Sequence, residues 1–417
     1  MDRALVTLRV GPGRSSPDEV ARVAAAVRGA LDGSGPAVAV LPAGPSGGAP
    51  DDPDPPAGRV PGPVALVVRT SGSTGRARHV LLDRDALAAS AAATRARLGG
   101  PARWLLALPL DHVAGLQVVA RSLLTPAPGA DGPGALAAAA TGPAPAVVAG
   151  PADAAALADA VRRERATTDL PLVTSLVPTQ LRRAVEAGPA VLEALRGLHA
   201  ILVGGAATPA PLLAQARDAG LRVVTTYGMT ETCGGCVYDG APLDGVEVAL
   251  DDRGRVLLGG PVLARGYLDD PAGQAAAFPT LDGRRWHRTS DLGRLADGRL
   301  TVLGRADDVV VTGGENVAPA AVEAAVAALG PRHVAEVCVV GVPDAEWGAA
   351  VVAVVVPGPV PPALEDVRSA VRRTLGPAAA PRHLVLVDAL PLRGPGKVDR
   401  AAVARTAARG LGRPGHD

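Results

Sequence analysis

Short apolar runs alternate with helical segments through the middle of the chain, and this alternation restricts the fold more than any other feature. Consecutive parallel strands need a crossover of about a dozen residues, usually a helix, whereas antiparallel strands can be joined by a tight turn. The pattern therefore predicts a parallel sheet covered by helices. Its strands are expected at 146–149, 172–176, 200–203 and 222–226, and its helices at 152–165, 179–186 and 209–219.

Other patterns flank this region. We expect a strand, a helix and a strand within residues 1–40, and a proline- and glycine-rich linker at 42–63. A helix at 83–98, a strand at 104–108, a helix at 116–124 and a low-complexity stretch at 126–145 follow. Short strands with turn signals at 244–303 predict a small antiparallel barrel or sheet. The predicted fold class is α/β, with a large N-terminal domain at 1–306 and a small mobile C-terminal α+β domain at 307–417.

Composition excludes several kinds of function. The formal net charge is +1 and aromatic residues make up 2% of the chain, so nothing indicates a nucleic-acid partner. The 3 cysteines do not form a disulfide framework, and no window is apolar and long enough for a membrane span. The N-terminus has no signal-peptide pattern, so a cytoplasmic protein is expected.

Lysine is almost absent from this chain. Lys and Arg total 42 residues, and Lys397 is the one lysine. It lies in a glycine-rich approach near the C-terminus, 391–400. A chemical need for a compact ammonium, which a planar guanidinium cannot imitate, explains this exception better than chance.

A hydroxyl- and glycine-rich segment follows an apolar run at 64–68. It reads Thr70-Ser-Gly-Ser-Thr-Gly75. Glycine lets the backbone approach an anion, and exposed N–H and hydroxyl groups donate to it, so the segment is suited to hold phosphate. It lacks the spacing of a Walker loop. A plain turn after a strand would have the same composition.

Six separated motifs together resemble the adenylate-forming superfamily of acyl-CoA synthetases, adenylation domains and luciferases. They are, in chain order, the 70–75 segment, Tyr227-Gly-Met-Thr-Glu-Thr232, Thr289-Ser-Asp291, Gly304-Arg-Ala-Asp-Asp308, Gly313-Gly-Glu-Asn-Val-Ala-Pro319 and Gly394-Pro-Gly-Lys397. The resemblance implies an enzyme that uses ATP and Mg²⁺ to join an acid to AMP. A thiol, here coenzyme A, then displaces the AMP.

The resemblance also implies roles for individual residues. Tyr227 would stack on adenine, Thr230 would bond the α-phosphate, and Glu231 would hold Mg²⁺. Lys397 would bridge the carboxylate and the α-phosphate, Asp307 would be the hinge between domains, and Gly313 and Gly314 would approach coenzyme A. The remaining nucleotide-binding residues implied are Thr70, Ser71, Gly72, Ser73, Thr74, Gly75, Gly204, Gly205, Ala206, Gly228, Asp291 and Arg305.

The sequence departs from the family pattern next to the phosphate loop. Arg76 and Arg78 stand where lysines are common, and His79 takes a usual glycine position. Ser290 replaces a usual glycine as well.

Two segments resemble the o-succinylbenzoate–CoA ligases of menaquinone biosynthesis. They are 109–124 and 175–181. The resemblance implies an aryl dicarboxylic acid as substrate, with His112, Ser175 and Thr179 beside it. Arg121 would hold the second carboxylate, because an Arg fork suits a carboxylate. A homodimer is possible.

Several alternatives remain open. Arg121 could be a solvated helix residue and His112 a structural one. Asp111 would suit an amino-acid adenylation enzyme, and other aryl or fatty acyl-CoA ligases share the same motifs. Cys233 and Cys236 are more simply explained as lining of the substrate cleft than as a redox or zinc pair. A non-catalytic nucleotide-binding scaffold is disfavoured by the retention of Lys397.

Overall fold

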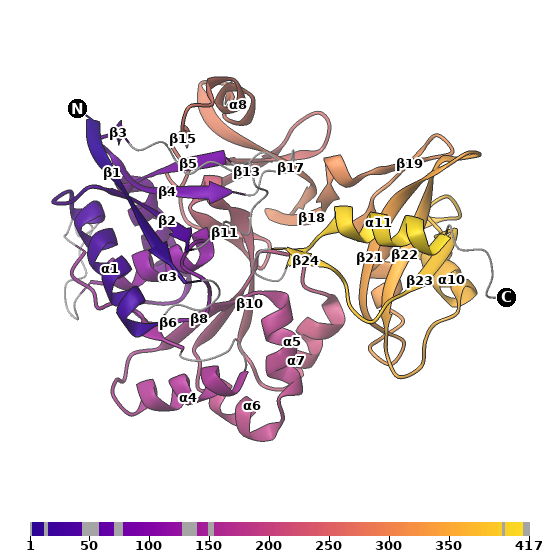
Figure 1. The fold of residues 1–417 in the computed structure, drawn as a ribbon, viewed down its shortest axis with the longest axis horizontal. Helices are drawn as coiled ribbons and strands as arrows, with labels where there is room; N and C mark the ends of the chain where they lie inside the picture. The colour runs from indigo at the N-terminus through magenta and orange to yellow at the C-terminus, as the bar shows by residue number, and fades with distance from the viewer. Residues whose placement is uncertain are drawn as a thin grey trace.

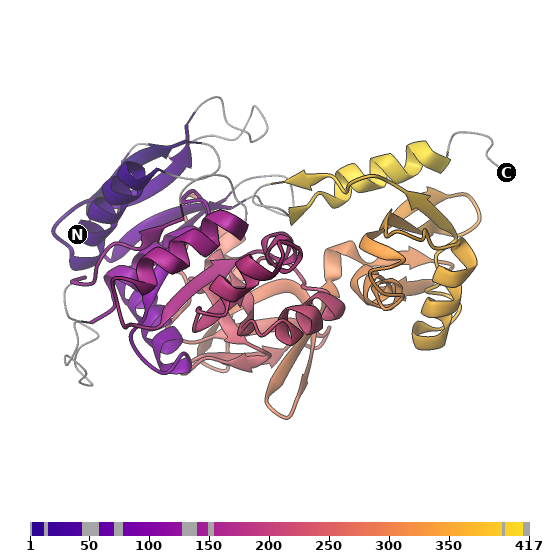
Figure 2. The ribbon, with the colours of Figure 1, turned by 90° about the horizontal axis from the view of Figure 1, so that it is seen from below.

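The computed structural model describes residues 2–11, 16–43, 58–70, 78–126, 140–148, 154–393 and 397–411. An N-terminal part of three sheets is followed by a smaller C-terminal part, which lies to the right in Figures 1 and 2. Within these residues no helix is long and apolar enough to cross a membrane.

The first sheet has six strands, of which β1, β2 and β4 are parallel. Helix α1 (Pro17–Asp32) begins at a capping box, in which Ser16 and Glu19 bond each other's backbone N–H, and ends at Gly33 in the left-handed conformation. In spatial order the strands are β15 (Gly266–Tyr267), β5 (Arg78–Asp83), β4 (Val64–Thr70), β2 (Ala37–Pro42), β1 (Asp2–Val10) and β3 (Arg59–Pro61).

The second sheet has seven strands. Five of them, β7, β6, β8, β9 and β10, are neighbours and run parallel. Carboxyl ends of parallel strands meet at one edge, so loops from distant parts of the sequence come together there. In spatial order the strands are β12 (Ala241–Pro242), β11 (Gly234–Tyr238), β10 (Val223–Met229), β9 (Ala200–Val203), β8 (Leu172–Leu176), β6 (Arg103–Leu106) and β7 (Ala146–Val147).

Helices cover both faces of the second sheet. Strand β6 shows why: Trp104 and Leu106 enter the core shared with the first sheet, while Leu105 between them enters the core on the opposite face. The first core holds α1, α2 (Arg84–Arg97) and α3 (Val113–Leu123). The second core holds α4 (Ala154–Arg165), α5 (Pro178–Glu186), α6 (Pro189–Leu195) and α7 (Ala210–Asp218).

The third sheet is antiparallel and small. Its strands are β13 (Glu247–Leu250), β14 (Arg255–Gly259), β16 (Thr280–Leu281), β17 (Arg284–Ala296) and β18 (Arg299–Arg305), and α8 (Pro271–Ala277) packs beside β17.

The C-terminal part has two hydrophobic clusters of its own, made only of residues from Val310 onward. It follows the short turn η3 (Ala306–Asp308). Its elements are β19 (Val310–Thr312), β20 (Glu315–Val317), α9 (Pro319–Ala327), β21 (Val334–Asp344), β22 (Gly348–Pro357), α10 (Leu364–Leu375), β23 (His383–Leu386), β24 (Leu392–Arg393), β25 (Lys397–Val398) and α11 (Arg400–Leu411).

The predicted fold class is confirmed, with corrections in detail. Helix α3 begins at Val113, not at 116, and Gly115 lies inside it, where any Cβ would collide with the carbonyl of Pro109. The glycine allows a close approach to the preceding turn. Strand β5 and helices α6, α8 and α11 were missed. The predicted linker at 42–63 and the low-complexity stretch at 126–145 fall largely outside the described residues.

Candidate active site

The carboxyl edge of the second sheet gathers residues that the sequence motifs singled out. His112 follows the turn after β6 and is the N-cap of α3. Ser175 lies near the end of β8, Gly204 directly follows β9, and Tyr227 lies in β10. Thr179 stands in the first turn of α5. These strands are neighbours in the sheet, so the residues share one edge.

Tyr227 joins the second sheet to the third. Its hydroxyl donates a 2.7 Å hydrogen bond to Oδ2 of Asp291 in β17. Asp291 pairs across the strands with Arg305 in β18, whose Nη1 lies 3.9 Å from Oδ1 of Asp291. Arg305 also donates to Asp307 at 2.6 Å. An aromatic ring, a carboxylate and a guanidinium are thus held at one junction.

Burial dominates the protonation of this group. It raises the pKa of Asp291 above the usual value, although the hydrogen bond from Tyr227 and the charge of Arg305 act against it. Burial, then the charge of Asp291, also raises the pKa of Tyr227. The tyrosine therefore keeps its proton and remains a donor.

A tight turn follows β10. Gly228 has φ +156° and so little space that a Cβ would collide with the carbonyl of Gly234, so only glycine fits. The turn η2 (Thr230–Thr232) is closed by Thr232, whose hydroxyl accepts from the N–H of Met229 at 3.0 Å. This turn presents Thr230 and Glu231.

Glu231 is held on one side only. The hydroxyl of Tyr267 in β15 donates to its Oε1 at 2.9 Å. Within the described part of the chain, Oε2 accepts no hydrogen bond, and no cluster of three His, Cys, Asp or Glu residues could form an all-protein metal site. A single carboxylate with a free oxygen is what Mg²⁺ uses when phosphates supply other ligands.

The predicted phosphate loop is described only at its two ends. Ser71, Gly72, Ser73, Thr74 and Gly75 lie outside the described residues, as does Arg76. Thr70 ends β4 and Arg78 begins β5, and these two residues pair across antiparallel strands. The loop therefore leaves and re-enters the same sheet, instead of leading directly into a helix.

Small residues continue the edge after β9. A Cβ on Gly204 would collide with the hydroxyl of Thr226 in β10, so this position requires the close approach that glycine allows. Gly205 has φ +81° and Ala206 follows it. Both are exposed here.

His112 and Arg121 stand at opposite ends of α3. Nine residue steps separate them, which correspond to about 13 Å along a helix axis. His112 lies 3.8 Å from the carboxylate of Asp111. Arg121 is buried, with 6% of its surface exposed, and its guanidinium lies 5.6 Å from the centre of the Trp104 ring.

Arg121 has no counter-ion among the described residues. Its Nε and Nη2 find no hydrogen-bond partner among the described residues. It lines a small pocket with Trp104, Arg95 and Thr125, residues that the sequence did not single out. An uncompensated buried charge costs several kcal/mol, on the order of 3–5. The pocket measures about 10 Å³, room for about one water, so a carboxylate would have to widen it to pair with Arg121.

Gln117 connects this end of α3 to the turn after β10. It lies one helical turn before Arg121 and donates to the carbonyl of Cys233, as the hydroxyl of Ser90 does at 3.4 Å. Cys233 and Cys236 are fully buried, and burial raises the pKa of both thiols, to about 12 for Cys236. Protonated buried thiols are unreactive, which disfavours redox chemistry.

Lys397 lies in β25, paired with β24 in a two-stranded hairpin. Its side chain and residues 394–396 are outside the described part. In both views the hairpin extends from the C-terminal part toward the N-terminal part (Figures 1 and 2). Gly313 and Gly314, by contrast, form the turn between β19 and β20, and a Cβ on Gly313 would contact the Trp347 ring.

Comparisons with known proteins agree with this arrangement. Residues 14–268 match the AMP-binding enzyme family and residues 321–397 match its C-terminal domain. The chain therefore belongs to the AMP-binding enzyme family, which confirms the resemblance in its motifs.

Individual relatives narrow the likeness. A probable 2-succinylbenzoate–CoA ligase of Mycobacterium tuberculosis is 45% identical over 348 residues, covering 82% of this chain and 84% of the relative. An indoleacetate–CoA ligase of Aromatoleum aromaticum is 34% identical, covering 82% and 67%. The o-succinylbenzoate CoA synthetase of Bacillus subtilis, solved with an acyl-adenylate intermediate, is 27% identical with a TM-score of 0.66, covering 82% and 69%.

Proposed function

We propose that the chain is an AMP-forming acid–CoA ligase whose acid is o-succinylbenzoate. ATP and the acid give an acyl-adenylate and pyrophosphate, and coenzyme A then displaces AMP to form the thioester. The proposal is supported by the relatives and, within the structure, by one observation above all. Arg121 is buried, and its Nε and Nη2 find no hydrogen-bond partner among the described residues, on the helix whose N-cap is His112.

The nucleotide is assigned to the junction of the second and third sheets. Tyr227 would stack on adenine, Asp291 and Arg305 would bond the ribose hydroxyls, and Thr230 would bond the α-phosphate. Because Gly228 has no Cβ, the backbone before η2 can pack closely enough for Thr230 to reach the α-phosphate. Gly204, Gly205 and Ala206 would line the adenine site, and residues 70–75 would surround the outer phosphates.

The acid is assigned to the space along α3. Its reacting carboxyl would lie near His112, with Ser175 and Thr179 on the neighbouring elements. The guanidinium of Arg121 lies over Trp104 near the start of β6, so the acid would have to extend along α3 from His112 to reach it. A dicarboxylate would then neutralise Arg121 with its second carboxyl. Bidentate pairing makes this the main source of selectivity.

Glu231 is the residue placed to hold magnesium. Its free Oε2 and the absence of a protein cage in the described residues fit an ion that takes most of its ligands from phosphates and water. Bound Mg²⁺ would neutralise phosphate charge during displacement. The protein supplies the fixed position of Glu231 beside Thr230.

The C-terminal part is assigned the mobile role. We take residues 1–306 and 307–417 as the two domains, with Asp307 as the hinge. Lys397 would stabilise charge between the carboxylate and the α-phosphate during adenylation. Rotation would then remove it and bring Gly313 and Gly314 toward coenzyme A, so one site could run both half-reactions.

The proposal is tested by measuring AMP release with ATP, Mg²⁺ and coenzyme A across a panel of acids. The panel contains o-succinylbenzoate, benzoates, indoleacetate, fatty acids and amino acids. We expect turnover with o-succinylbenzoate and little with monocarboxylates. Turnover with a monocarboxylate and none with o-succinylbenzoate would retain the class of ligase and reject this substrate.

Arg121 has its own test. Arg121→Gln should raise the KM for o-succinylbenzoate about a hundredfold, because a charge-assisted hydrogen-bonded pair is lost, and leave the KM for ATP unchanged. Arg163→Gln, on the exposed face of α4, is the matched control. An equal rise in both KM values would remove Arg121 from the acid pocket.

A further inference from the structure

Tyr267 contacts both Glu231, in the turn after β10, and Arg78, at the start of β5, and no sequence motif connected these residues. It comes from β15, on the edge of the first sheet, while its hydroxyl reaches the turn after β10 in the second sheet. It donates to Glu231 Oε1 at 2.9 Å. Among the described residues, this hydroxyl is the group that donates a hydrogen bond to the carboxylate assigned to magnesium.

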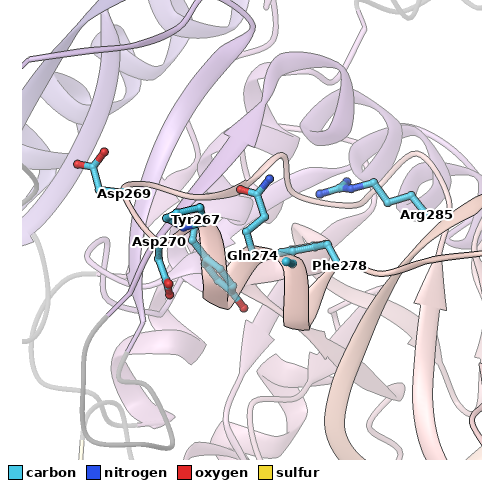
Figure 3. Close-up of a pocket in the computed structure, with 8 residues that line it drawn as sticks. Tyr267, Asp269, Asp270, Gln274, Phe278 and Arg285 are labelled. Atoms are coloured by element: carbon cyan, nitrogen blue, oxygen red, sulfur yellow. The ribbon is translucent and has the colours of Figure 1, made fainter.

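The Tyr267 ring is fixed on both sides. Phe278 packs against it edge to face, with ring centres 5.6 Å apart, and Arg78 lies 4.9 Å from the ring centre. Figure 3 shows the ring beside α8, with Gln274 and Phe278 next to it, at a surface depression of about 340 Å³. Only 5% of Tyr267 is exposed, so its hydroxyl has little freedom.

Arg78 links the same ring to the predicted phosphate loop. It begins β5, at the end of the segment 71–77, and its Nε lies 3.3 Å from Asp270 Oδ2. Strand β5 pairs with β15 through Val80 and Tyr267. A single ring therefore contacts the residue that leaves the phosphate loop and the carboxylate that follows β10.

We propose that Tyr267 is a positioning residue for metal binding. By holding Oε1 of Glu231 it would leave Oε2 to coordinate the magnesium that accompanies ATP. The inference rests on the proposed role of Glu231. Mutation of a partner that orients a metal ligand typically costs about 10- to 100-fold in metal affinity or activity.

The test is Tyr267→Phe, which removes only the hydroxyl and keeps the ring against Phe278 and Arg78. Mn²⁺ binding is followed by electron paramagnetic resonance in the presence of ATP, and the Mg²⁺ concentration for half-maximal adenylation is measured in parallel. We expect the affinity for Mn²⁺ to fall about tenfold and the Mg²⁺ concentration for half-maximal adenylation to rise about tenfold. The melting temperature should stay close to wild type.

Tyr238→Phe is the matched control. The hydroxyl of Tyr238 is also buried and pairs with Thr94 at 3.2 Å, away from the site. This variant should bind Mn²⁺ as wild type does. Equal weakening in Tyr238→Phe and Tyr267→Phe would show a general effect of losing a buried hydroxyl and would overturn the positioning role.

Glu231→Gln separates failure of this inference from failure of the proposed function. If Glu231→Gln weakens Mn²⁺ binding and Tyr267→Phe does not, the positioning role is wrong and the metal assignment stands. If neither variant changes Mn²⁺ binding, the metal assignment is wrong and the role of Tyr267 falls with it.

Discussion

The nucleotide side of the site and the C-terminal hairpin are built in opposite ways. Tyr227, Asp291 and Arg305 come from three strands in two sheets. A part-buried hydrogen bond from Tyr227 to Asp291 and the ion pair of Asp291 with Arg305 hold them in one place. Lys397 lies on a two-residue strand whose partner β24 carries Leu392, half of whose surface is exposed. The difference fits the proposal that the nucleotide-binding groups are preorganised and that the ammonium of Lys397 is delivered by the C-terminal part.

The two parts also have separate cores. The C-terminal clusters contain no residue before Val310, and a defined contact with the N-terminal part runs through Arg182 of α5. Arg182 donates to the carbonyl of Ala335 at 2.6 Å and lies 3.4 Å from the carboxylate of Glu336. A contact of this size can hold one orientation and still be broken during a reaction cycle.

The largest expected effect is that of Lys397→Ala. Removing a cation that acts only in the transition state of adenylation should slow that half-reaction by a factor on the order of a hundred to a thousand. Thioester formation from supplied acyl-adenylate should be unchanged. Arg405→Ala, on the exposed face of α11, is the control. Equal slowing of both half-reactions would contradict a delivered cation.

A smaller effect is expected for Asp291→Asn. Loss of the charged acceptor should weaken binding of ATP and of acyl-adenylate alike, about tenfold or more, because the group is part of the fixed site. Isothermal titration with each nucleotide measures this, and Asp252→Asn on an exposed turn is the control. If only ATP bound more weakly, Asp291 would not contact the adenosine that ATP and the acyl-adenylate have in common.

The same substitution should increase stability at neutral pH. A carboxyl whose folded pKa is raised costs stability above that pKa, and the cost disappears as pH falls below the unfolded value. Asp291→Asn should therefore melt higher than wild type at pH 7, with the difference shrinking near pH 4. A gain that is constant over this range would mean that charge is not its cause.

Arg182→Ala should have the smallest effect. Losing an ion pair whose side chains are about a quarter exposed corresponds to about two- to fivefold in rate. We expect this loss in adenylation alone, since the contact accompanies the orientation in which the Lys397 hairpin extends toward the N-terminal part (Figure 1). The neighbouring exposed Arg183→Ala is the control. Slowing of both half-reactions, or of Arg183→Ala equally, would remove the contact from domain placement.

Sequence reasoning found what is local and missed what depends on distant contacts. The alternation of apolar runs and helices predicted β8, β9 and β10 closely, because each strand and its crossover are read from adjacent residues. Helices α6 and α8 were missed because each has only 7 residues, too few for a clear period. Strand β5 was missed because its residues follow directly on the glycine-rich segment 70–75 and were taken as part of that loop.

The site divides in the same way. Tyr227 and Glu231 share one short motif, which the sequence singled out, and their roles stay predictions. Tyr267 was missed because its hydrogen bond spans 36 residues, and Gln117 because its partner is 116 residues away. Hydrogen bonds of this kind depend on how distant elements pack together, and a single stretch of sequence does not show that packing.

The most direct measurement is exchange of labelled pyrophosphate into ATP without coenzyme A, because it reports the acyl-adenylate step alone. Wild type should exchange only when o-succinylbenzoate is present, and Lys397→Ala should lose this exchange. Exchange that needs no acid, or that survives in Lys397→Ala, would contradict activation of the acid by a delivered ammonium.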